Sequence, residues 1–178
     1  MDFIDLLDLS GQSDLEISSG GIRARHRPDI APLAFETVII GSVYDSLNEA
    51  ALPAFLDGAN LDFFEELFRN CNGMHVGATK FGVFGFTTGD QSIGVPWDIE
   101  LPNAVTRATR PSGTLIVGTS TETDKSGMRL ERYHSIQRTP EIHVTPSDDF
   151  SMVLRSYGSV SDWLQTEVSL ALSDREHW

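Results

Sequence analysis

Cysteine is almost absent from this sequence, and its scarcity limits the chemistry available to the chain. The 178 residues contain one cysteine, Cys71. A single thiol excludes an internal disulfide, and it cannot supply the several thiolates of a structural zinc site. Because structural disulfides belong to oxidising compartments, we expect the chain to work in the reducing cytoplasm.

Positive charge is also scarce. Lys and Arg number 13 against 26 Asp and Glu, which gives a formal net charge of −13. The excess is larger in the first 70 residues, with 13 acids against 4 bases, than in the other 108, with 13 against 9. Nucleic-acid binding relies on a basic surface, so we expect no nucleic-acid partner. Acidity of this size indicates either solubility or a basic protein partner.

Long apolar runs are missing as well. No segment approaches the roughly 20 apolar residues that a membrane-spanning helix needs. The first eight residues, MDFIDLLD, carry acids where a signal peptide would carry lysine or arginine. We therefore expect a soluble cytoplasmic protein that has no membrane partner.

Several catalytic and ligand-binding motifs are absent. The chain has no Gly-x-Ser-x-Gly elbow, and the stretch GTSTETDKSG lacks the Gly-Lys-Ser/Thr ending of a phosphate-binding loop. The five histidines are widely separated, with no His-x-x-x-His pair. These are His26, His75, His134, His143 and His177. The sequence therefore predicts no metal site and no cofactor.

A hydrolase using Cys71 or a loop carboxylate stays open as an alternative. His75 lies four residues beyond Cys71, and a thiol nucleophile needs such a base. However, Cys71 continues a helical stripe of large apolar residues, Phe64, Leu67 and Phe68, at i, i+3, i+4 and i+7. This spacing favours a buried structural thiol.

The patterns that are present predict an α+β fold, with a central, mostly antiparallel sheet flanked by N-terminal and C-terminal helices. Hydrophobic residues make up 40% of the chain, which is ordinary for a globular protein. Helices are expected at 1–9, 46–56, 60–71, 147–157 and 159–168. Strands are expected at 34–40 and 79–86, in a hairpin over 115–133, and at 141–145. Residues 10–33 read as a linker with one possible short strand, and 87–113 as an irregular excursion.

Capping residues and glycines predict where several helices and strands begin and end. Asn60 is suited to cap the helix before Cys71, and Gly73 supplies the left-handed residue that ends it. Glu65 and Arg69 are spaced to pair on its solvent face. In the following strand, Gly82 and Gly85 indicate a bulge or a close backbone approach. Ser159 and Asp162 predict the cap of the last helix.

The order of these features resembles the SUKH superfamily, known from bacterial immunity proteins and yeast cell-wall assembly regulators. The matching pieces are FFEELFRNCNG, FGVFGF, LIVGTSTETDKSG and SVSDWLQTEV. The most specific parts are Asn72-Gly73, Phe84-Gly85 and the run from Ser161 to Leu164. The likeness covers roughly residues 47 to 170, so we divide the chain into an N-terminal extension, 1–45, and a SUKH-like domain, 46–178.

This resemblance implies a domain without catalytic residues that works by binding. Bacterial members of the family look like immunity proteins that neutralise a cognate toxin, often a nuclease or deaminase, inside the producing cell. An acidic immunity protein suits the basic substrate groove of a nuclease, since opposite charges speed association. A regulatory scaffold of the same fold, binding another cellular protein, is the alternative reading. The oligomeric state stays open.

Acids on loops are the expected partner-binding residues, because loops on a rigid scaffold carry binding residues disproportionately. Two near-neighbour pairs stand out, Asp98 with Glu100 and Glu122 with Asp124. Paired carboxylates also suit acid–base catalysis, although a solvated loop face is the commoner origin of such pairs. We assign these four acids to the partner interface.

Overall fold

A computed structural model describes residues 14–18, 21–25, 36–40, 61–77, 80–85, 98–137, 139 and 141–173. Its strands form one nine-stranded sheet in which the neighbours follow chain order. Every pair of adjacent strands is antiparallel, and helices lie against the sheet, so the predicted α+β fold is confirmed. The helices expected at 1–9 and 46–56, with the proposed domain boundary, lie outside the described residues.

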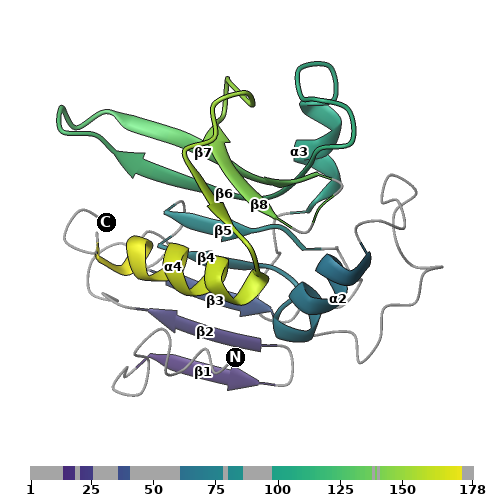
Figure 1. The fold of residues 1–178 in the computed structure, drawn as a ribbon. Coiled ribbons are helices and arrows are strands. Elements are labelled where there is room, and N and C mark those ends of the chain that lie inside the picture. The colour runs from purple at the N-terminus through teal and green to yellow at the C-terminus, as the bar shows by residue number, and fades with distance from the viewer. Residues whose placement is uncertain are drawn as a thin grey trace.

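The strands run as an antiparallel meander from one edge of the sheet to the other (Figure 1). Their bounds are β1 Leu15–Ser18, β2 Gly21–Arg25, β3 Glu36–Ile40, β4 Met74–Val76, β5 Phe81–Val83, β6 Leu115–Thr123, β7 Arg129–Ile136, β8 Ile142–Pro146 and β9 Arg155–Tyr157. The hairpin expected over 115–133 and the strands expected at 34–40 and 141–145 are therefore confirmed as β6–β7, β3 and β8. β1 and β9 are the edges.

Strand register places a continuous buried row on one face of the sheet. Directly paired residues of antiparallel strands lie on the same face. One such row crosses four strands as Met74, Val83, Gly118 and His134, and it belongs to the buried side. The neighbouring row on β6 and β7 contains Thr119 and Tyr133. One face of the sheet is therefore the core wall.

Helix α2, Leu61–Asn70, forms because its apolar residues share one stripe. Phe63, Phe64, Leu67 and Phe68 are at most 2% exposed. The predicted Glu65–Arg69 pair is present, with 3.1 Å between the side-chain nitrogen and oxygen. Gly73 has φ of 100°, as expected for the residue that ends this helix. The predicted cap, Asn60, lies outside the described residues.

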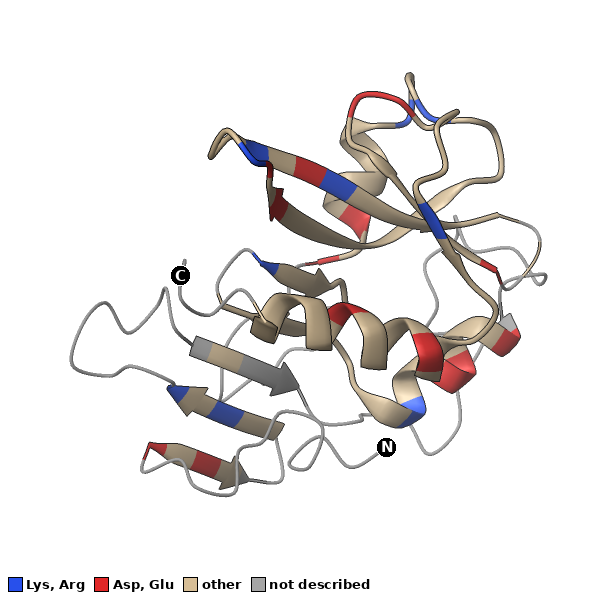
Figure 2. Cartoon of the chain, turned by 60° about the vertical axis from the view of Figure 1, so that its left-hand side comes forward, with Lys and Arg blue, Asp and Glu red and all other residues tan. Residues whose placement is uncertain are grey.

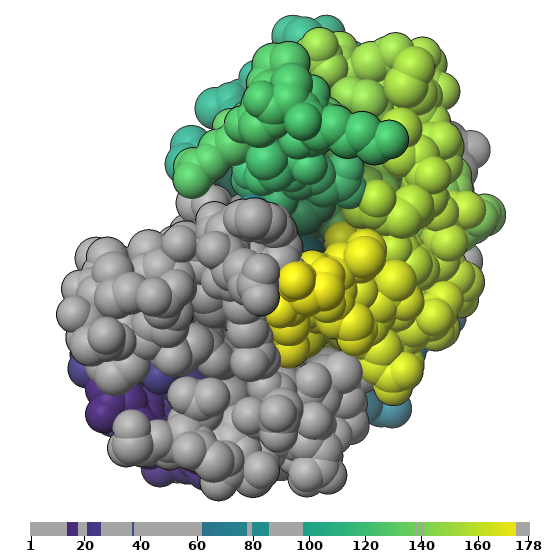
Figure 3. All heavy atoms as spheres, turned by 90° about the vertical axis from the view of Figure 1, so that its left-hand side faces the viewer, coloured from purple at the N-terminus to yellow at the C-terminus, as the bar shows by residue number. Residues whose placement is uncertain are grey.

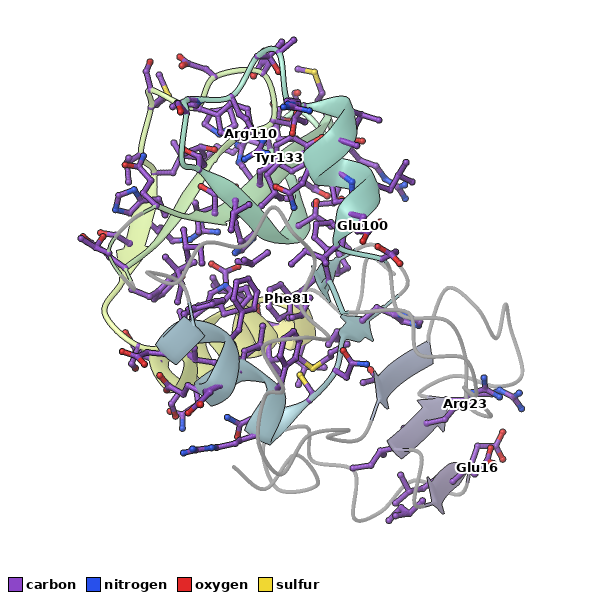
Figure 4. All side chains as sticks on the ribbon, turned by 90° about the vertical axis from the view of Figure 1, so that its right-hand side faces the viewer. Glu16, Arg23, Phe81, Glu100, Arg110 and Tyr133 are labelled. Atoms are coloured by element: carbon purple, nitrogen blue, oxygen red, sulfur yellow. The ribbon has the colours of Figure 1, made fainter. Side chains whose placement is uncertain are left out.

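Helix α4, Val160–Ser173, closes the apolar face. Its start is capped as predicted, since the Ser159 hydroxyl accepts a hydrogen bond of 3.1 Å from the Asp162 backbone. Trp163 is fully buried, and its ring meets Phe81 of β5 edge to face at 5.8 Å. Figures 1 and 4 place α4 beside α2 on this side of the sheet, with Phe81 next to it.

The expectation of an irregular excursion over 87–113 is wrong for its second half. Residues Glu100–Val105 form a short helix, α3, beside β6. The buried Asn103 side chain holds it there, donating to the Ile116 carbonyl at 2.8 Å and accepting from the Ile116 backbone N–H at 2.9 Å. Helix α3 is held against β6 by the hydrogen bonds of Asn103 and not by a stripe of apolar residues. A search of the sequence for apolar periodicity therefore does not find this helix.

The helix predicted over 147–157 is also wrong. Asp149 folds the chain into a turn by accepting from the Ser151 backbone and hydroxyl, and residues 155–157 form β9 against β8. Tyr157 lies where its hydroxyl reaches the Glu167 carboxylate at 2.6 Å. The helical spacing of Phe150, Val153 and Leu154 is overridden by the local turn at Asp149 and by the pairing of β9 with β8.

Two smaller expectations also change. The predicted linker, 10–33, contains two strands, β1 and β2, which pair with each other and join the sheet through β3. Of the bulge or close backbone approach expected at Gly82 and Gly85, the structure shows the close approach at Gly85, and a register shift occurs in β6 between Ile116 and Gly118. Within the described part of the chain, no helix has the length and apolar character to cross a membrane.

Gly85 allows two motif pieces to touch. A Cβ atom built on Gly85 would lie 2.3 Å from the Asn72 carbonyl oxygen, too close for any side chain. Asn72-Gly73 and Phe84-Gly85, although separated in sequence, therefore meet at one point. The glycine here is required by close backbone approach.

We predict that Gly85→Ala lowers the free energy of unfolding by about 1–3 kcal/mol, because backbone must move to admit the methyl group. Gly158→Ala is the matched control, since nothing lies within 4 Å of its added Cβ. Urea unfolding of both variants checks this prediction. Equal stability of the two variants would contradict the close approach.

Candidate functional site

A polar groove lies between the β6–β7 hairpin and the second half of α4. Its volume is about 310 Å³. Figure 3 shows the surface hollowed between the green hairpin and the yellow helix. Its lining residues come from β6, β9 and α4 and from the turn before β5: Lys80, Ser120, Thr121, Glu122, Thr123, Arg155, Glu167, Leu170 and Ala171.

Glu167 forms the floor of this groove. Its side chain is 3% exposed, and it accepts hydrogen bonds from the Tyr157 hydroxyl at 2.6 Å and from Nε of Arg155 at 3.1 Å. The carboxylate raises the pKa of Tyr157, after burial, which has the larger effect. A carboxylate held by a cation and a hydroxyl is a stable buried group. The Glu167 carboxylate at the floor of the groove is therefore held in place by Arg155 and Tyr157.

Glu122 stands at the rim of the groove, and its side chain is 35% exposed. One carboxylate oxygen lies 2.6 Å from Nη1 of Arg155, and the other lies 3.2 Å from Nε of Arg132. Arg155 therefore bridges the carboxylates of Glu122 and Glu167 and joins β6, β9 and α4. The rim acid is held in one position.

His134 lies below the groove in a single protonation state. The Trp163 indole N–H donates to its Nδ1 at 2.8 Å, and its Nε2 lies 2.8 Å from the Ser120 hydroxyl oxygen. An indole nitrogen only donates, so Nδ1 carries no proton and Nε2 carries the proton. Burial lowers the pKa of His134 to about 3, with the charge of Arg155 acting in the same direction. The ring is neutral at pH 7.

This tautomer decides what Ser120 can do. A serine nucleophile needs a histidine nitrogen with a free lone pair to take its proton. The nitrogen facing Ser120 is Nε2, which already carries a proton and donates it to the hydroxyl oxygen. Ser120 is therefore not activated by His134, and the trio Ser120–His134–Trp163 acts as a polar brace inside the core.

The Cys71 thiol is also inaccessible to solvent. Its side chain is fully buried, and burial raises its pKa to about 12. A thiol nucleophile acts as the thiolate, in a partly exposed site. The expectation of a buried structural thiol is confirmed, and the geometry does not support a hydrolase that uses Cys71.

The four acids expected on loops do not form one surface, and two of them are not on loops, since Glu100 begins α3 and Glu122 lies in β6. Asp98 and Glu100 lie at α3, while Glu122 and Asp124 lie at the β6–β7 hairpin, toward the other side of the molecule (Figure 1). The Asp124 carboxylate accepts from the Ser126 hydroxyl, which lowers its pKa, and from the Met128 backbone. Asp98 accepts from the Glu100 backbone at 2.7 Å. Only Glu122 borders the groove.

Sequence reasoning missed Arg155 and Glu167. Both lie within stretches that the pattern assigned to helices, Arg155 wrongly and Glu167 correctly. Glu167 follows Trp163 and Leu164 on the buried stripe of α4, at i+4 and i+3. An acid on an apolar stripe requires a buried partner, and that requirement was the available signal.

Comparisons with known proteins return nothing. No protein-family model, no curated protein and no solved structure matches the chain. Among the described residues, no group of three or more His, Cys, Asp or Glu side chains is placed to hold a metal ion.

We predict that His134 makes stability fall with acidity. Its folded pKa of about 3 lies below the unfolded value of about 6.5, so between these values only the unfolded chain binds the proton. The free energy of unfolding should then decrease by about 1.4 kcal/mol per unit as pH falls below about 6.5. Urea unfolding between about pH 7 and 5 measures this slope. The His134→Gln variant should lose this pH dependence of the free energy of unfolding. If the variant keeps the full slope, the pH dependence does not come from His134.

We predict that Ellman's reagent does not react with Cys71 in the native protein at about pH 8, because the thiol is buried and protonated. The same reagent should react fully in concentrated guanidinium chloride. Rapid reaction of the native protein would mean that the thiol is accessible.

Proposed function

We propose that the protein is a non-catalytic binding protein that neutralises a basic toxin, in the manner of the SUKH immunity proteins that its sequence resembles. The partner docks on the acidic helical face, defined as the exposed surface of α2 and of the first half of α4, together with the groove rim at Glu122.

The observation that carries this proposal is the charge of the two neighbouring helices. Asp62, Glu66 and Asp162 are exposed on α2 and α4, whereas Arg69 is the one base in these two described helices. Figure 2 shows the red positions following one another along this side. Since Arg69 pairs with Glu65, these three carboxylates dominate the surface. Such a surface attracts a basic partner and speeds encounter.

The groove rim adds a fixed polar contact to this surface but no net negative charge, because Glu122 is paired with two arginines. Two arginines hold the Glu122 carboxylate in place, so little side-chain freedom is lost when a partner contacts it. Leu170, which is 46% exposed, lines the same groove and adds an apolar contact. A rim with fixed charges beside an apolar side chain is suited to protein recognition.

The state of the buried groups favours binding over catalysis. Ser120 faces a protonated nitrogen of His134, the Cys71 thiol is buried, and Glu167 is saturated by Arg155 and Tyr157. These groups specify the fold of the surface above them.

The first experiment is a pull-down from the native organism with the tagged protein, eluted by salt and identified by mass spectrometry. We expect a stoichiometric basic protein encoded by the adjacent reading frame, because charge pairing is weakened by salt. Its expression alone should arrest growth, and co-expression of this chain should restore it. Recovery of an unrelated housekeeping protein would favour the regulatory scaffold instead.

We predict that the triple reversal Asp62→Lys, Glu66→Lys and Asp162→Lys slows association with that toxin about 10- to 100-fold and flattens its salt dependence, because steering is lost. Stopped-flow kinetics at two salt concentrations measure both effects. Glu16→Lys is the control, an exposed acid on β1 away from the helices (Figure 4). Equal slowing by the control, or none by the triple variant, would contradict this placement.

A further inference from the structure

Three consecutive apolar side chains are exposed just before the last strand of the sheet. Met152, Val153 and Leu154 are 53%, 48% and 40% exposed. Single exposed apolar residues are ordinary, but a run of three on a folded surface is costly unless it has a use. Figure 3 shows the chain around residue 150 as part of a continuous yellow-green surface at the upper right.

The run leads directly into an open strand edge. β9 is the last strand in the sheet order and pairs with β8 alone. The Leu154 backbone N–H also donates to the Val144 carbonyl at 2.8 Å, so the chain already follows β8 before β9 begins. No described strand lies on the outer side of the segment Met152–Tyr157, which we name the edge segment.

Within the part of the chain that the structure describes, the edge segment lacks proline, lysine and a further strand on its outer side. Proteins block exposed edges with proline, with outward charges, especially lysine, or with a covering element. The sequence from 151 to 157, SMVLRSY, contains neither proline nor lysine. Its one charge, Arg155, turns back into the molecule to reach Glu122 and Glu167. Among the described residues, no strand pairs with the outer side of this segment, and its first three side chains are apolar and exposed.

Acids border the edge segment at both ends. Asp148 and Asp149 are exposed in the turn before it, and Asp149 stays ionised because the Ser151 hydroxyl lowers its pKa. At the other end, Glu141 precedes Ile142, the residue paired with Tyr157, and its side chain is 50% exposed. Two copies paired at this edge would bring like charges together, whereas a basic strand would meet opposite ones.

We propose that the edge segment binds an extended segment of a partner protein in which basic and apolar residues alternate, and that this segment adds to β9 as a further strand. Backbone hydrogen bonds supply affinity in this mode, and side chains select the sequence. The apolar residues of the partner cover Met152–Leu154, and its basic residues meet the flanking acids. This proposal does not rest on toxin neutralisation, since a regulatory scaffold would use the edge in the same way.

The test uses two labelled peptides of equal length with the full-length protein, one alternating lysine and valine, the other glutamate and valine. Fluorescence anisotropy should show binding of the lysine peptide and at least tenfold weaker binding of the glutamate peptide. Val153→Lys should weaken the lysine peptide at least tenfold, because a charge then blocks the edge. Met128→Lys adds the same charge at an apolar residue 58% exposed in the hairpin turn, and should bind as the parent does.

Equal loss in the two lysine variants would overturn the proposal, since charge alone would then explain binding. Backbone amide exchange should slow across Arg155–Tyr157 when the lysine peptide binds, and unchanged exchange there would also overturn it. A dimer of the free protein that Val153→Lys dissolves would assign the edge to a second copy instead. The reversal of Asp62, Glu66 and Asp162 should leave peptide binding within about threefold, which separates this result from that for the helical face.

Discussion

The hydrogen bond from the Trp163 indole to Nδ1 of His134 connects helix α4 to the centre of the sheet. It places a large aromatic ring against Phe81 and sets the tautomer of a fully buried histidine. Nε2 of His134 then donates to the Ser120 hydroxyl, so a helix and two strands share one polar line through an otherwise apolar core. Since an unpaired polar group at this depth would cost several kcal/mol, the three side chains position one another strongly.

Arg155 extends this organisation to the surface. By joining Glu167 of α4 to Glu122 of β6, it fixes the groove rim and removes positive charge from the strand edge to which it belongs. One side chain therefore shapes both proposed contact regions. Both proposals name the same class of partner, a basic protein, and the His134, Ser120 and Glu167 side chains make their hydrogen bonds inside the molecule.

Elements with a regular apolar period were predictable, and those defined by single polar contacts were not. The stripe of Phe64, Leu67 and Phe68 gave α2, and alternation gave the β6–β7 hairpin. Helix α3 depends on Asn103 bonding to the backbone of Ile116, and β9 depends on pairing with β8, neither of which leaves a local period. For the same reason the sequence pointed to Glu122 only as an acid expected on a loop. It did not point to Arg155, which pairs with Glu122, or to Glu167, which pairs with Arg155.

The protonation state of His134 distinguishes a structural brace at the centre of the molecule from a reaction centre. The most direct measurement is a long-range proton–nitrogen correlation NMR spectrum of the His134 ring at neutral pH. We expect a neutral ring with its proton on Nε2 and an unprotonated Nδ1, unchanged down to about pH 5, because burial lowers the pKa of His134 to about 3. A proton on Nδ1, or an imidazolium that forms near pH 6.5, would contradict this expectation and would leave Ser120 beside a working base.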